Sequence, residues 1–276
     1  MEDVLWAGKC PYHYENILPS LRLASRIILN FPQIYLPFAS RAKVGCIAEL
    51  LYLDPERLRE IYGPDECQKL IELIHEHLPA IGLKPVIGLQ PGLFDNLWAR
   101  TTFSEDQDGK RDTIWLPYEL VNELGSMEYR RPPQYHKKAI ITFFISTLIL
   151  RELRHVLERR GDQERSVRDN IPPAANVERP LFGGPIEPIL SDEDDITTIR
   201  GVGIRLVTLD CLTMEFAPSH IEFLLNSTNW RTRPELRPPL QTFFSFTALM
   251  DPDITVKDPE SSKGTGASSK RKERII

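Results

Sequence analysis

An apolar run in the second half of the sequence constrains the fold more than any other feature. Residues Ala139–Leu150 read AIITFFISTLIL without a charged side chain, Lys137 and Lys138 precede them, and Arg151 follows at once. A helix needs about 20 apolar residues to cross a bilayer, so this run is too short for a membrane span. We therefore expect a buried helix from about Tyr135 to Arg160, around which other elements pack.

The rest of the sequence predicts a mixture of helices and strands. Apolar spacing and terminal signals such as Asp54-Pro55-Glu56 predict the helices, and β-rich alternation with an Asp108-Gly109 turn predicts a hairpin. Helices are predicted at residues 18–29, 55–61, 70–78, 117–125 and 218–225, and strands at 84–89, 97–103, 113–116 and 199–209. The acidic run Ser191–Asp195 is predicted to be a solvated loop.

Composition excludes several classes of protein. The chain has 276 residues, 41% of them hydrophobic, and a net charge of −5, which fits neither a disordered chain nor a nucleic-acid-binding protein. Four widely spaced cysteines and a start without an apolar signal segment favour an intracellular, cytoplasmic protein with free thiols. Residues 270–274 read KRKER and serve either as a nuclear import signal or as part of a solubilising tail.

The motif that points to chemistry stands at the end of the long helix, where Arg151 to His155 read R-E-L-R-H. Zinc peptidases carry H-E-x-x-H on a helix because residues four apart share one face, so two imidazoles bind one Zn²⁺. The intervening Glu accepts a proton from the metal-bound water. Here Glu152 occupies the base position and His155 the second-ligand position, whereas Arg151 stands where the first ligand belongs.

A later acid completes the pattern. Glu178 follows His155 by 23 positions and opens the segment ERPLFGG, and the third ligand of such a site can be a carboxylate from a later segment. Residues 97–184 thus resemble the zincin-like metallopeptidase family of the glutamate-ligand (gluzincin) type. More closely, they resemble uncharacterised fungal proteins in which a helix bearing H-E-x-x-H precedes an acid and a Phe-Gly-Gly segment.

The resemblance implies a zincin-like α+β fold, with a long central helix packed against a small mixed sheet. The resemblance places a zincin-like domain at residues 83–250, whereas the predicted helices mark an N-terminal helical part at 1–82 and the polar composition of 255–276 predicts a disordered basic tail. It also implies that Glu152 is the general base, that His155 is a zinc ligand and that Glu178 is the third ligand.

Arg151 departs from the family pattern. A guanidinium stays protonated, has no lone pair to offer and repels a dication. A cation on an apolar helix face needs a partner, because an unpaired buried charge is costly. We therefore expect an ion pair between Arg151 and Glu178 in the volume that zinc would fill. In the alternative interpretation Arg151, Glu152 and Arg154 form the solvated end of a core helix.

Three functions follow from these alternatives. The first is a metallopeptidase-like protein without a cofactor, a pseudoenzyme that binds a peptide or protein partner and neither nucleic acid nor membrane. The second is an active zinc-dependent hydrolase that uses His155, Glu178 and an unrecognised ligand. The third is an interaction protein that never had an active site.

Overall fold

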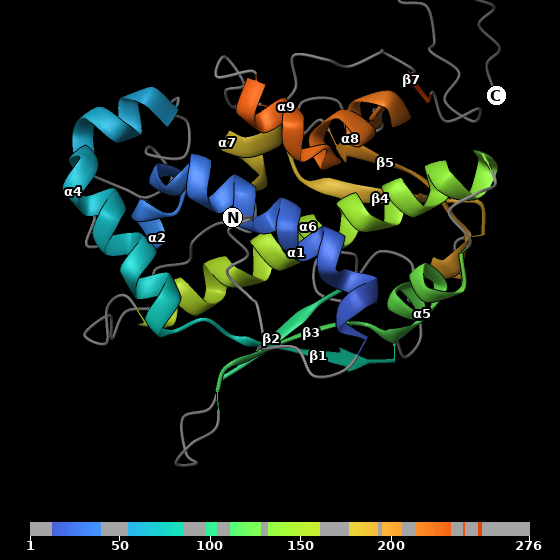
Figure 1. Cartoon of the computed structure of the whole chain (residues 1–276), viewed down its shortest axis with the longest axis horizontal. Helices are drawn as coiled ribbons and strands as arrows, with labels where there is room; N and C mark the ends of the chain where they lie inside the picture. The colour runs from blue at the N-terminus through green and yellow to red at the C-terminus, as the bar shows by residue number, and fades with distance from the viewer. Residues whose placement is uncertain are drawn as a thin grey trace, which may run out of the picture.

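The computed structural model describes residues 13–39, 55–85, 98–103, 111–127, 132–160, 177–192, 195–205, 213–232, 240 and 248–249. The tail at 255–276, for which disorder was predicted, lies outside these residues. The described part is a mixture of helices and strands, as the sequence predicted, but its strands form two small sheets instead of the single one expected. Figure 1 shows helix α6 (Pro132–Arg160) crossing the middle of the molecule, with one sheet on each side of it.

Helix α6 confirms the predicted buried helix and begins at Pro132 instead of Tyr135. Every residue from Ala139 to Leu150 is buried. Two buried hydroxyls of this run bond to the helix backbone, since Ser146 Oγ donates to Thr142 O (2.7 Å) and Thr147 Oγ1 to Phe144 O (2.7 Å). The run therefore tolerates polar side chains inside the core because their donors are satisfied. None of the described helices is long and apolar enough to cross a membrane.

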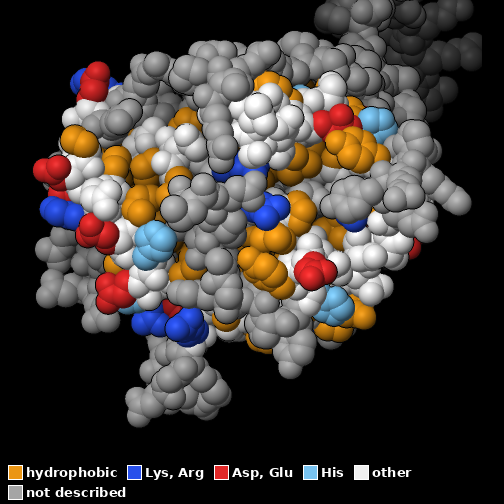
Figure 2. Space-filling model, in the orientation of Figure 1, with side chains coloured by type: hydrophobic (Ala, Val, Ile, Leu, Met, Phe, Trp, Pro, Cys, Tyr) orange, Lys and Arg blue, Asp and Glu red, His pale blue; other side chains and the backbone are white. Residues whose placement is uncertain are grey.

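Helices from the first part of the chain cover one side of α6. They are α1 (Tyr14–Asn30), the 3₁₀ turn η1 (Pro32–Ile34), α2 (Leu36–Ala39) and α4 (Pro55–Glu76). Small side chains bring α1 close to α6, because Ser20 Oγ donates to Thr142 O (2.9 Å) and Ser146 Oγ to Ser20 O (3.1 Å). Helix α4 kinks at Gly63, whose φ of 78° suits glycine, at the predicted break. Figure 2 shows acidic and basic side chains mixed over α4, at the left of that view.

The first sheet contains β1 (Ala80–Lys84), β2 (Arg100–Thr102) and β3 (Thr113–Pro117) in the order β1-β3-β2. Strands β2 and β3 are antiparallel, which confirms the predicted hairpin. Of the strand predicted at 84–89, Lys84 is the last residue of β1, and residues 86–89 lie outside the described ranges. The start of β1 at Ala80 was not predicted, because its pairing is parallel with the distant strand β3 and leaves no local signal.

The second sheet has the order β4-β5-β6-β7, with antiparallel neighbours throughout. Its strands are β4 (Ile186–Leu190), β5 (Ile199–Arg205), β6 (Thr213–Glu215) and β7 (Ala248–Leu249). Strand β5 confirms the start of the strand predicted at 199–209, whose last four residues lie outside the described ranges. The described residues of the acidic run, Ser191, Asp192 and Asp195, are exposed as predicted, and Asp195 caps the 3₁₀ turn η2 (Ile196–Thr198).

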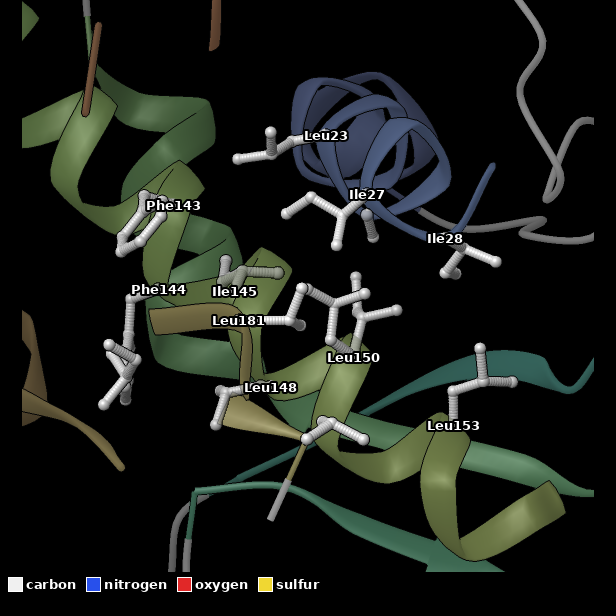
Figure 3. Packing of buried hydrophobic residues seen from close by; sticks show 14 of the residues in the cluster. Leu23, Ile27, Ile28, Phe143, Phe144, Ile145, Leu148, Leu150, Leu153 and Leu181 are labelled. Carbon is white, nitrogen blue, oxygen red and sulfur yellow. The ribbon is translucent and has the colours of Figure 1, made fainter. Parts of the chain in front are cut away.

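Short helices close the fold. Helices α5 (Tyr118–Ser126) and α8 (Pro218–Leu225) match their predictions, whereas α7 (Glu178–Phe182) and α9 (Ser227–Thr232) were not predicted. The buried hydrophobic residues form one cluster. Figure 3 shows Leu23 and Ile27 of α1 pointing toward α6, with Leu181 of α7 packed beside it. Burying each apolar side chain of this kind stabilises the fold by about 1.5–3 kcal/mol. Because buried side chains from several elements pack against it, α6 is the centre of the hydrophobic core.

Candidate functional site

The R-E-x-x-H residues occupy the turns of α6 that follow its apolar run, and they differ in exposure. The Arg151 side chain is 15% exposed, Glu152 is 6% exposed as a residue, and the His155 side chain is 40% exposed. The Arg154 side chain is also mostly buried, at 11%. The alternative of a solvated helix end is therefore wrong for these residues, with the partial exception of His155.

The predicted ion pair between Arg151 and Glu178 is confirmed. Arg151 donates from Nη2 (2.8 Å) and from Nε (3.2 Å) to the same oxygen, Oε1, of Glu178. Arg151 Nη2 also donates to Ile186 O at 3.1 Å, and Glu178 Oε2 accepts from Ile186 N at 3.2 Å. Both members of the pair therefore also bond to the backbone of β4 at Ile186. The Glu178 side chain is fully buried. Charge-assisted bonds of this kind are about twice as strong as neutral ones.

Local chain geometry delivers Glu178 to this position. Glu178 is the first residue of α7, and the helix ends at Gly183, whose φ of 90° lies in the left-handed region. Gly183 N donates to Arg179 O (2.7 Å), which closes the helix end. The chain then turns directly into β4 at Ile186, the strand whose backbone holds both members of the pair. The Phe-Gly-Gly segment therefore makes the turn that brings the acid and β4 together.

Glu152 contacts the edge of the first sheet. Thr101 Oγ1 donates to Glu152 Oε2 at 2.7 Å, and it lies 3.4 Å from Glu152 O. Thr101 is on β2, the edge strand in the order β1-β3-β2. This contact places the predicted hairpin beside the long helix. Thr101 was not itself a predicted site residue, because only the tertiary fold brings residue 101 to residue 152.

His155 is engaged within its own helix. Its Nδ1 lies 3.4 Å from Glu158 Oε2 and 3.4 Å from Arg154 Nη2. Arg154 in turn pairs with Glu158 at 3.3 Å, and its guanidinium carbon lies 5.5 Å from the centre of the Phe38 ring. The imidazole therefore stands among a carboxylate and a guanidinium on the partly exposed side of α6.

A tyrosine that the sequence did not reveal lies close to the ion pair. Tyr35 is fully buried, and its hydroxyl donates to Leu150 O at 3.3 Å. Burial, and secondarily the negative charge of Glu178, raise the pKa of the Tyr35 phenol well above its usual value. The phenol is therefore neutral at physiological pH, and the charges buried here are those of Arg151 and Glu178.

These residues do not fit a zinc ion as they stand. Arg151 supplies a positive charge and no lone pair, and it engages Glu178, the carboxylate that a metal would need. Within the described ranges, no three His, Cys, Asp or Glu side chains come together in a way that could hold a metal ion. The arrangement can hold a buried ion pair and present Glu152, Thr101 and His155 beside it.

The end of α6 is also fixed to the first sheet. Arg160 donates from Nε (2.8 Å) and Nη2 (2.7 Å) to the two carboxylate oxygens of Asp112, whose side chain is 3% exposed. Asp112 O accepts from Ala80 N (2.8 Å), so this residue joins the helix to the start of β1.

In comparisons with known proteins, no family model, no curated protein and no solved structure matches this chain.

Proposed function

We propose that this chain is a zincin-like, metallopeptidase-like protein that has lost its metal site and acts by binding a peptide or protein partner. The observation that carries the proposal is the buried ion pair between Arg151 and Glu178. It places a permanent cation at the position of the first ligand in R-E-x-x-H, against the acid that would be the third ligand. An additional dication in this place would be repelled by Arg151 and would compete with it for Glu178.

The surroundings support a zincin-like origin. A long helix carries Glu152 and His155, a small mixed sheet lies along it, and the edge strand β2 contacts Glu152 through Thr101. A later segment delivers a buried acid to the face of Arg151. If the site were active, Glu152 would be the general base. With Arg151 present, the same parts form a rigid, charged face without a Lewis acid.

The binding surface that we propose is the face where β2 runs beside the end of α6. An edge strand can accept an extended peptide through its backbone groups. Peptides selected on the wild-type protein from a random display library should bind about 10-fold more weakly to Arg100→Glu, which changes an exposed side chain of β2. Lys84→Glu is the matched control, because Lys84 is exposed on β1 at the opposite edge of the same sheet.

Metal analysis tests the loss of the zinc site. The wild-type protein, purified and dialysed against zinc, should hold much less than one Zn²⁺ per chain and show no peptidase activity. Arg151→His restores H-E-x-x-H and should raise the zinc content toward one per chain. Arg154→His is the control, because it adds the same side chain at a variable position of the motif, where no zinc ligand is expected. Glu152→Gln in the Arg151→His background should keep the metal and remove any activity that the reversion restores.

The outcomes separate the three functions. Stoichiometric zinc in the wild-type protein, with activity that Glu152→Gln abolishes, would establish the active hydrolase and overturn the proposal. A folded Arg151→His variant that binds no more zinc than Arg154→His would indicate an interaction protein without an ancestral site.

A further inference from the structure

A second site lies away from the ion pair, in a pocket of about 330 Å³ between α1, α6 and the junction of α8 with α9. Its volume falls within the range of small-molecule sites. Thr142 lines it and precedes Arg151 by nine residues, which is about 14 Å along the helix axis. The pocket is therefore separate from the site in the proposed function.

Three cations line this pocket. Arg22 and Arg26 are four residues apart on α1 and share one face, and Lys138 lies one turn before Thr142 on α6. None of the described residues that line the pocket is acidic, although the chain carries a net charge of −5. Figure 2 shows Lys and Arg side chains near the middle of this face, over α1 and among hydrophobic ones. Such a concentration of positive charge attracts anions.

The pocket is built on rigid elements. Arg26 Nη1 donates to Leu225 O at 2.9 Å, which holds its guanidinium against the end of α8. Lys138 Nζ lies 3.4 Å from Met127 O, at the end of α5. The hydrogen bond from Ser20 Oγ to Thr142 O (2.9 Å) joins α1 to α6 at the pocket. Arg26 and Lys138 are thus held in place before a ligand arrives, which lowers the entropic cost of binding.

The remaining lining residues suit a ligand with an organic group. Asn226 and Ser227 add neutral polar side chains, and Pro19 and Leu225 add apolar surface. Tyr135 stands at the pocket with 43% of its surface exposed, so its ring is accessible. Guanidinium groups bind phosphate through paired N–H donors. Three cations also match the charge of a phosphate dianion better than they match the charge of a single carboxylate.

We propose that this pocket binds a small organic phosphate, with the phosphate between Arg22, Arg26 and Lys138 and the organic part against Tyr135. Phenyl phosphate is a suitable probe for calorimetric titration of the full chain at low salt. It should bind at one site per chain and at least several-fold more tightly than inorganic phosphate, because only the ester contacts the apolar wall. Phenol at the same concentration should not bind.

Two variants test the site against general charge attraction. Lys138→Gln should weaken phenyl phosphate binding about 10-fold, whereas Lys137→Gln should change it less than about 2-fold. Lys137 is the matched control: it is adjacent to Lys138 in the sequence, but it pairs with Glu123 (2.7 Å) and does not line the pocket. Arg22→Gln provides a second test if Lys138→Gln fails to fold, as judged by circular dichroism.

Several results would overturn the proposal. They are the absence of saturable binding up to about 10 mM phenyl phosphate, equal losses in Lys138→Gln and Lys137→Gln, and phenol binding as tight as that of the ester. Inorganic phosphate binding as tightly as phenyl phosphate would overturn the assignment of the organic group to Tyr135.

Discussion

Removing Arg151 should destabilise the protein through the charge that it leaves behind. Arg151→Met keeps most of the side-chain volume and deletes two hydrogen bonds to Glu178 Oε1 and one to Ile186 O. Charge-assisted bonds contribute about 1.5–3 kcal/mol each, and breaking a buried pair costs about 3–5 kcal/mol. Because the Arg151 side chain keeps 15% exposure, we expect a loss of about 3 kcal/mol.

Urea denaturation at neutral pH measures this loss, with circular dichroism and tryptophan fluorescence as independent probes of unfolding. With a denaturant slope near 3 kcal/mol/M, the midpoint should fall by about 1 M. Adding Glu178→Gln to Arg151→Met removes the stranded charge and keeps an acceptor for Ile186 N. The double variant should therefore regain about 2 kcal/mol, because replacing both partners of a buried pair costs less than breaking it.

Two results would refute this reasoning. A loss below about 1 kcal/mol in Arg151→Met would mean that the pair is solvated and behaves as a surface salt bridge. A double variant no more stable than the single one would mean that the loss comes from packing and not from the charge of Glu178. In either case the pair could not explain the proposed loss of the zinc site.

Three further predictions concern other parts of the fold. Burial lowers the pKa of His220 from its usual value of 6.5, so the stability that its neutral form contributes above pH 6.5 is lost as the pH falls toward the native pKa. His220→Gln should therefore make the urea midpoint depend less on pH between about pH 7 and 5. An unchanged pH dependence in this variant would contradict the prediction. Ser146→Ala should lower the unfolding free energy by about 1 kcal/mol, while exposed Ser126→Ala changes it little; equal losses would argue against the α1–α6 contact. Arg160→Met should lower the unfolding free energy by about 3 kcal/mol, because it leaves the buried Asp112 carboxylate without its cation. Asp112→Asn in that background should recover part of the loss in the same denaturation assay. A loss below about 1 kcal/mol in Arg160→Met would mean that the pair is solvated.

Local signals predicted the elements that local forces determine. The charge-free run of α6, the proline at the start of α8 and the Gly63-Pro64 break each leave a pattern in neighbouring residues. Strand β4 was missed because Pro188 interrupts its pattern, and because its partners in β5 lie 9 to 18 positions further along the chain. Helix α7 was missed because five residues are too few to show a helical period.

In the candidate site too, contacts that leave a signal in the sequence could be predicted, and contacts that depend on the tertiary fold could not. The Arg151–Glu178 pair could be predicted because a cation on an apolar helix face requires a partner, and the zincin-like resemblance singled out Glu178, 27 positions later, as the acid at the site. Thr101 and Tyr35 could not be predicted, because each reaches α6 through tertiary packing over a long separation. Whether the face binds a peptide stays a prediction.

The central position of α6 also affects how the chain folds during synthesis. Phe143 packs against Phe182 and Phe216, with ring centres 5.6 and 5.1 Å apart, and both partners follow α6 in the sequence. While the ribosome is still making residues 161–216, one apolar side of α6 is complete but uncovered. Nascent chains arrested in this interval should therefore be the species that chaperones hold and that aggregate when chaperones are scarce.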